Sequence, residues 1–503
     1  MAQNEPFTVM SETRELHGRR VIYTFASEVN ENNVLDVLSR AMEKHALNSS
    51  EIDYLWKYRN GLQPILFRTK KGSYEDIVNK IVENRASEII DFKLGYYVGE
   101  PIQYTSKKDD DKSLAEMQRF NDYMYSVCKA SQDQDIVEWQ MVCGTAFRIV
   151  LPNKNRAIKT QKPFEMYTLD PRSTFVVRSL EMGNKPLLAV QYYVDEEEPV
   201  QEHYTCYTDS QVFTITNSFI EKVEDNPLGR IPIIEYPANN SRIGAFEVVL
   251  PLLDTINKID SNRMDGIEQT VEAFIKFINC EIDKEQFEEF KAMGAIMVKS
   301  VDGGNADVDV VTTNLDQNQT QTSKDDLYDA VIEICGMPSR TGGASTSDTG
   351  AAVILRDGYA LAESRAKVFE NLFKASEMEM IDLAMFICNS TDGVEPIELK
   401  AWEVETKFTR RNYENIMSKA QVLDTMVNNP KIHPILGFQS CGLFPDPEAA
   451  YVLSEKYYEE TMAKYEPQEV NEDEESLRAD RQIVDETEKD DNKGISTADK
   501  LGV

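Results

Sequence analysis

The segment from Gly336 to Ala366 combines residue types that favour a polar loop held between two helices. Pro338 disfavours helical geometry at Met337, and a Gly-Gly pair a few residues later gives the backbone wide freedom. Asp348 or Thr349 can cap the helix that follows. A polar loop between two helices is a common design for a motor element, a gate or a lid, and all three are open at this point.

The motifs of common enzyme classes are absent from the sequence. There is no GxxxxGK[ST] phosphate loop, HExxH motif, GxSxG motif or glycine-rich dinucleotide fingerprint. Each of the dispersed histidines is more commonly a surface or hydrogen-bonded residue than a catalytic one: His17, His45, His203 and His433. The acidic pairs Asp307/Asp309 and Asp325/Asp326 could bind a divalent cation, but a solvated face is their commoner role. We therefore expect no catalytic residue, metal or cofactor.

The charge balance bears on nucleic-acid binding. The chain has 87 acidic and 54 basic residues, a net charge of −33. Such a surface repels nucleic acid except where basic residues concentrate. The basic clusters are short, and solvated loops explain them better than binding sites do: Lys107-Lys108, Lys154 with Arg156 and Lys159, and Arg410-Arg411. Sequence-specific recognition of nucleic acid is not expected.

Neither a signal peptide nor a membrane span is expected, because no window of about 18 apolar residues occurs. The 7 cysteines are scattered and form no CxxC pair, which is typical of small buried residues in a reducing compartment. A length of 503 residues predicts two or more globular units.

Apolar periodicity predicts an α+β fold with helices at both ends of a strand-rich middle. The predicted helices cover residues 32–44, 51–59, 74–97, 114–143, 252–278, 323–335, 351–389, 413–427 and 447–465. Strands are predicted between 146 and 237 and again at 397–408. A small α/β insert, a helix followed by strands at 295–300 and 306–315, is expected near 280–321. The acidic tail from residue 466 should be solvated and disordered.

Four collinear segments carry a resemblance to a known family. They are Leu94–Ser106 (LGYYVGEPIQYTS), Gly229–Asn240 (GRIPIIEYPANN), Gly336–Arg365 with its proline loop and long helix, and Phe408–Arg410 with the helices after it. Together they resemble the portal proteins, or head-to-tail connectors, of long-tailed bacteriophages that infect Gram-positive bacteria. No single string is diagnostic, but the set covers about 92–465, and the acidic tail also fits.

The resemblance implies a portal-type fold that assembles as a ring, usually a dodecamer. Its regions would be an N-terminal arm (1–30), a wing (31–245), a stem helix (246–278), a clip (279–321), a second stem helix (322–337), a tunnel loop (338–350), a long wing helix and strand (351–409), a crown (410–465) and a disordered tail (466–503).

The resemblance also implies roles for particular residues. The tunnel loop would face DNA through Ser339, Arg340, Thr341, Gly342, Gly343, Ala344, Ser345, Thr346, Ser347 and Asp348. Gly336, Pro338 and Gly350 would act as hinges, and the candidates for the stem surface are Lys258, Arg263 and Lys324. Arg263 could pair with an acidic residue of a neighbouring subunit or face the lumen. Pro251 would delay the first stem helix or kink it.

The implied function is a channel at one capsid vertex through which a terminase packages double-stranded DNA and through which the DNA is later ejected. The implied partners are further copies of the chain, double-stranded DNA without sequence specificity, the terminase large subunit, a head-completion or adaptor protein, and the major capsid and scaffolding proteins, with no membrane. The implied location is the virion, and the host cytoplasm during assembly. A phage nuclease or motor-associated enzyme and a ring-forming scaffold or adaptor remain the alternatives.

Overall fold

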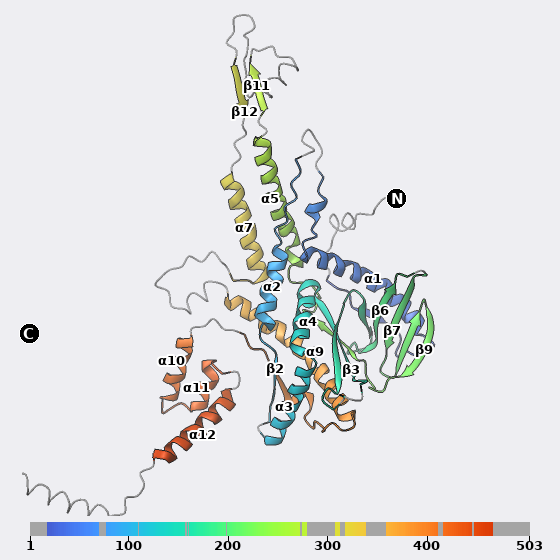
Figure 1. Cartoon of the computed structure of the whole chain (residues 1–503), viewed down its shortest axis with the longest axis vertical. Helices are drawn as coiled ribbons and strands as arrows, with labels where there is room; N and C mark the ends of the chain where they lie inside the picture. Colours follow the sequence, from blue (N-terminus) through green and yellow to red (C-terminus); the bar gives the residue numbers. More distant parts are fainter. Residues whose placement is uncertain are drawn as a thin grey trace, which may run out of the picture. The chain divides into compact units, whose positions relative to one another are not determined.

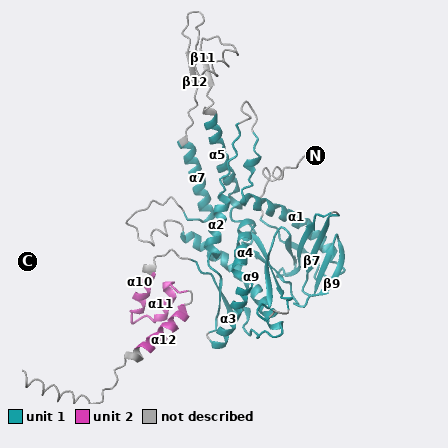
Figure 2. Ribbon diagram, in the orientation of Figure 1, with its two compact units in different colours: residues 1–413 teal, residues 414–503 magenta. Residues whose placement is uncertain are grey.

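The computed structural model describes residues 18–69, 77–108, 110–155, 158, 160–197, 199–271, 274–278, 307–311, 317–338, 359–410, 416–444 and 447–465. The chain divides into two compact units, within residues 1–413 and 414–503 (Figure 2). Helices and strands are mixed, which confirms the predicted α+β class. The predicted helix and first strand of the insert, the loop at 339–350 and the acidic tail lie outside the described residues.

Two sheets occupy the middle of the first unit, as the alternating pattern predicted. The larger has the order β1-β5-β6-β7-β8-β9, and the smaller has the order β10-β3-β4. The strands are β1 (Ile22–Thr24), β3 (Thr145–Pro152), β4 (Phe164–Leu169), β5 (Thr174–Ser179), β6 (Pro186–Asp195), β7 (Gln201–Tyr207), β8 (Gln211–Thr216), β9 (Phe219–Asp225) and β10 (Ile233–Pro237). β1 pairs parallel with β5, so the N-terminal segment is part of the larger sheet.

The helices that pack with these sheets depart from the predicted bounds for local reasons. α1 (Val34–Arg59) is continuous, because His45 and Asn48 are buried and carry its inner stripe across the predicted break. The helix predicted at 114–143 is two helices, α3 (Asp111–Ser126) and α4 (Lys129–Cys143), separated by Cys128 in the left-handed region (φ 53°). α9 (Tyr359–Ser390) is the long helix expected after the polar loop.

The helix predicted at 74–97 is shorter than expected. α2 (Arg85–Val98) begins where the Asn84 side chain accepts a hydrogen bond from the Ser87 amide, a typical N-cap. Residues 77–84 are neither helix nor strand. The prediction was wrong there because apolar spacing carries no information about hydrogen-bond partners. The backbone N–H groups of this segment donate to side chains of another helix instead of to its own carbonyls.

α5 (Leu250–Val271) and α7 (Gln317–Cys335) lie side by side, and β11 (Phe274–Ile278) pairs antiparallel with β12 (Asp307–Val311) (Figure 1). The helix predicted over 252–278 therefore stops at Val271. The sequence FIKFI, rich in β-branched and aromatic residues, is a strand instead. Pro251 lies in the first turn of α5, where its missing N–H forfeits no helical bond. It does not delay the helix.

Shorter elements complete the first unit. They are the 3₁₀ turns η1 (Pro64–Phe67), η2 (Glu247–Val249) and η3 (Ala401–Glu403), and the strands β2 (Gln103–Ser106) and β13 (Val404–Lys407), which pair antiparallel. The strand predicted at 397–408 is thus reduced to β13.

The second unit contains α10 (Ile416–Val427), α11 (Pro434–Cys441) and α12 (Pro447–Tyr465). α11 was missed, because it is short and begins with a proline. Its Gly437 leaves room for α10, since an added Cβ would lie 3.2 Å from Cβ of Met426. Among the described helices of both units, none is both long and apolar enough to cross a membrane.

Candidate functional site

The C-terminal end of α7, where the chain enters the polar loop, is capped by a Schellman motif. Gly336 has φ +66°, a value that favours glycine. Its N–H donates to the carbonyl of Glu333 (3.1 Å), and the N–H of Met337 donates to the carbonyl of Ile332 (2.9 Å). These two bonds define the motif and satisfy two of the four carbonyls that a helix end leaves free.

Two cations from other helices satisfy the remaining carbonyls. Arg365 of α9 donates to the carbonyl of Ile334 (Nη1–O 2.5 Å), and Lys93 of α2 donates to the carbonyl of Cys335 (Nζ–O 2.9 Å). Positive charge at a helix C-terminus is favoured by the helix dipole. We call Lys93, Gly336 and Arg365 the clasp, since Arg365 joins the helices that precede and follow residues 339–358.

The clasp is tightly packed. A Cβ added at Gly336 would lie 2.5 Å from Cδ of Arg365. Burial lowers the pKa of Lys93 to about 8; the nearby Cys335 thiol opposes this change, and the Arg365 charge adds to it. The sequence predicted the stop at Gly-Met-Pro, but nothing local to Lys93 or Arg365 indicated that both contact this helix end.

The first turns of α9 are held from the other side as well. Glu363 accepts hydrogen bonds from the Tyr96 hydroxyl of α2 (3.0 Å) and from Nη1 of Arg410 (2.6 Å). Arg410 belongs to one of the basic clusters considered for nucleic-acid binding. In the structure its guanidinium forms an ion pair with the Glu363 carboxylate. Lys108 of another cluster pairs with Glu403 (2.8 Å).

The three cations considered for the stem surface lie differently. Lys324 of α7 contacts two carboxylates, Asp260 of α5 (3.0 Å) and Glu83 (2.6 Å). Arg263 of α5 donates to Oε1 of Gln321 on α7 (2.8 Å), which gives it a partner within its own chain. Lys258 is exposed. Two of the three therefore join α5 to its neighbours.

A buried ion network fixes the middle of α9 to the rest of the first unit. Glu377 of α9 contacts Lys129 (2.6 Å), accepts from the Tyr236 hydroxyl (2.8 Å) and lies 3.4 Å from Arg148. Asp133 binds the same two cations, at 2.6 Å each. Burial disfavours the charged form of Glu377, but Lys129 and Arg148 outweigh it and lower the pKa of this carboxyl. Two positive and two negative charges thus balance inside the protein.

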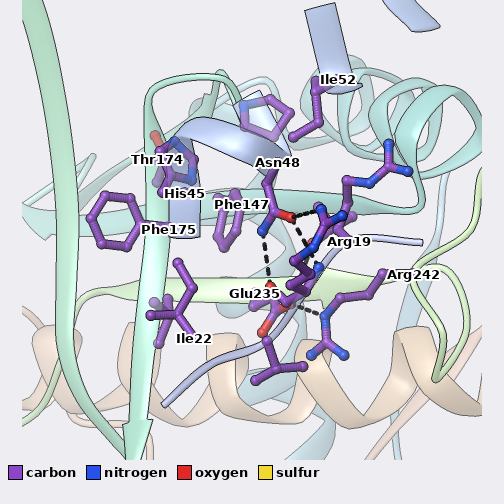
Figure 3. A pocket seen from close by; sticks show the side chains of 15 residues that line it. Arg19, Ile22, His45, Asn48, Ile52, Phe147, Thr174, Phe175, Glu235 and Arg242 are labelled. Carbon is purple, nitrogen blue, oxygen red and sulfur yellow. Dashed lines mark hydrogen bonds and ion pairs between the residues drawn. The ribbon is translucent and has the colours of Figure 1, made fainter. Parts of the chain in front are cut away.

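A small pocket beside β1 is lined by charged side chains, among them Arg19, Glu235 and Arg242, and each of these is ion-paired (Figure 3). Arg19 contacts Glu247 (2.7 Å), and Arg242 donates to Glu235 (2.6 Å). Burial opposes ionisation of Glu235, but Arg242 and Arg178 lower the pKa of this carboxyl to about 2. Burial lowers the pKa of His45 to about 4, so it is neutral at pH 7. Arg19 also contacts Glu51 of α1 (3.2 Å), so these ion pairs hold the N-terminal segment against α1 and η2.

The part of the chain that the structure describes bears on metal binding and disulfide formation. No cluster of three histidine, cysteine or acidic side chains there could hold a metal ion. The described cysteines are free thiols, and all except Cys128 are buried. The predicted DNA-facing residues from Ser339 to Asp348, and Gly350, lie outside the described residues, so their roles stay predictions.

Comparison with known proteins now adds to this geometry. Residues 39–472 match the family model described as phage portal protein, SPP1 Gp6-like. The chain is also 23% identical over 327 residues to the portal protein of Bacillus phage SPP1. That alignment covers 57% of this chain and 58% of the relative, so the chain spans less than two thirds of the relative's length. Because the family model covers most of the sequence, the chain belongs to the SPP1 Gp6-like family of phage portal proteins.

Proposed function

We propose that the chain assembles into a ring around a channel for double-stranded DNA, at the capsid vertex through which the genome is packaged and later ejected. In this proposal α5 and α7 are the stem, β11 and β12 belong to the clip, the sheets with α1–α4 and α9 are the wing, and α10–α12 are the crown. The terminase, capsid, scaffolding and head-completion proteins would be its partners in the virion and, during assembly, in the host cytoplasm.

The clasp is the observation that best supports a mechanical link between the stem helix α7 and the loop that follows it. Arg365 ties the end of α7 to α9, so the two helices that bracket residues 339–358 are joined at their base. A displacement of α7 is therefore passed to α9 as well as to the segment between them. We infer that residues 338–350 are the tunnel loop and that this loop meets DNA through Arg340 and the small polar residues around it.

The charge of the chain fits a conduit. Each copy carries −33, so most of the surface of a ring repels DNA instead of holding it. Weak binding favours rapid passage. Lys324, which faces two carboxylates, adds no free positive charge to the stem.

The ring itself is tested by negative-stain microscopy and by the mass of the purified assembly. A ring with a central hole, at a multiple of the chain mass, is expected. A compact monomer that cuts DNA in the presence of Mg²⁺ would instead establish the nuclease alternative.

The loop is tested by replacing both Gly342 and Gly343 with proline. Proline fixes φ and would stiffen the segment, so packaging should stop while rings still assemble. The matched control replaces both glycines with alanine, which restricts the backbone less. Packaging is measured as the amount of DNA protected from nuclease inside proheads supplied with terminase and ATP. Normal packaging by the proline variant would remove the loop from the mechanism.

A further inference from the structure

We propose that residues 63–69, which contain the 3₁₀ turn η1, and the extended residues 77–84 together form a splint that locks α5, α7 and α2 into one rigid body. This inference rests on the proposed function only in identifying α5 and α7 with the stem. It assigns a role to polar residues of α5 that would otherwise be attributed to a surface facing DNA or a neighbouring subunit.

The second segment is bonded to α5 by a ladder. Three of its backbone N–H groups donate to side chains of the helix: Asn79 to Asp265 (2.7 Å), Ile81 to Ser261 (3.0 Å) and Glu83 to Asn257 (2.8 Å). Alternate residues of an extended chain recur about every 6.6 Å. Every fourth residue of a helix recurs about every 6 Å. The two spacings match closely enough for the segment to run antiparallel along just over two turns of α5, from Asp265 to Asn257.

The acceptors on α5 are buried. Asn257, Ser261 and Asp265 are 1%, 0% and 3% exposed. A buried acceptor that loses its donor is costly, because no water replaces the bond. These residues are therefore committed to the splint, and they are not available at the surface of the first unit.

The first segment meets the same helix at both ends of the ladder. Arg68 donates to Asp265 (3.0 Å) and to Asn262 (2.6 Å), and the amide of Asn257 donates to Gln63. Asp265 thus accepts bonds from both segments and holds them together against α5.

α7 is attached to the second segment and to α2. Lys324 bridges Glu83 and Asp260 of α5. Tyr328 donates to Glu88 of α2 (2.9 Å), and the Arg85 guanidinium lies over its ring at 4.0 Å. Lys93, farther along α2, holds the end of α7 through the clasp. Since α2 contacts α7 both at Tyr328 and at the clasp, we expect a tilt of the stem helices to move α2 with them.

Hydrogen–deuterium exchange of the full-length ring tests the splint. Fragmentation that resolves single amides should show slow exchange at Asn79, Ile81 and Glu83. Exchange should be faster at Lys80 and Val82, whose N–H groups point to the opposite side of an extended chain. Uniform exchange along 77–84 in the unmodified protein would overturn the proposal, whatever the variants do.

Ser261→Ala removes one acceptor and little volume. It should speed exchange of the Ile81 amide at least tenfold. The matched control is Thr255→Ala, because the Thr255 hydroxyl is on the same helix but bonds only the Pro251 carbonyl within it (2.7 Å). Equal exchange in both variants would overturn the ladder.

A second test uses DNA packaging. A Ser261→Ala ring in which the Ile81 amide exchanges faster should also package DNA more slowly, and an unchanged packaging rate would overturn the rigid coupling. The exchange measurement needs no DNA. If the protein proved not to be a DNA channel, the exchange result would still test the splint.

Discussion

Replacing Glu377 with glutamine tests how strongly α9 depends on the buried ion network. Glu377 is fully buried, and Lys129 and Arg148 lower the pKa of its carboxyl, so it is ionised at neutral pH. Glutamine keeps the shape and removes the charge. Lys129 and Arg148 are then left with Asp133 as the only acidic member of the network.

The magnitude follows from burial and from the size of the unit. Breaking a buried ion pair by removing one partner costs about 3–5 kcal/mol. Unfolding entropy near 60 °C is about 2.1 cal/mol/K per residue, or about 0.9 kcal/mol/K for the 413 residues of the first unit. We therefore expect the Tm of this unit to fall by about 3–6 °C, measured by calorimetry at pH 7 and one protein concentration.

Two variants make this test specific. Glu379→Gln makes the same change on α9 at a side chain that reaches solvent, although partial burial raises the pKa of its carboxyl, so loss of this charge should lower Tm by less than about 1 °C. Lys129→Met in the Glu377→Gln background restores neutrality and leaves the Asp133–Arg148 pair. The double variant should lose less than the sum of the single losses. Equal shifts for Glu377→Gln and Glu379→Gln, or strictly additive losses, would refute the coupled network.

Two further predictions concern the clasp. Gly336→Ala should cost at least the 1–2 kcal/mol of a left-handed residue, because φ is +66° and the new Cβ meets Arg365. Urea denaturation of Gly336→Ala with and without Arg365→Ala checks this, and a loss independent of Arg365 would contradict the packing argument. Lys93 loses its proton near pH 8 when folded but near 10.5 when unfolded, so the unfolded chain binds more protons between these values. The free energy of unfolding should therefore rise with pH across this window. In Lys93→Met the free energy of unfolding should rise less over the same pH range. Identical pH profiles for the two proteins would show that burying the charged Lys93 costs no stability.

Much of the fold could be predicted from the sequence. The strand-rich middle, α7, α9 and α12 were predicted because their apolar residues recur at the period of the element they form. The errors have physical causes. His45 and Asn48 interrupt an apolar stripe, yet both are buried on α1. FIKFI continues the spacing of α5 but is paired with β12.

The candidate site was predicted only in part. The Gly-Met-Pro stop predicted the end of α7, because a glycine after a helix and a proline soon after are local signals. Lys93 and Arg365 were not predicted as partners of this end, since the bonds join residues far apart in the chain. Residues 77–84 of the splint were predicted as helix, because the bonds that hold them to α5 also join residues far apart in the chain.

The sequence by itself determined the α+β class, the order of most elements, the acidic charge and the family resemblance that the comparisons confirmed. The tertiary structure decided which polar residues face water and which face one another. Asn257, Ser261 and Lys324 are ordinary polar positions of amphipathic helices when read in sequence. Local patterns record how a residue relates to its neighbours along the chain. Only the folded arrangement brings the Glu83 backbone to Asn257, or the Arg365 guanidinium to the carbonyl of Ile334.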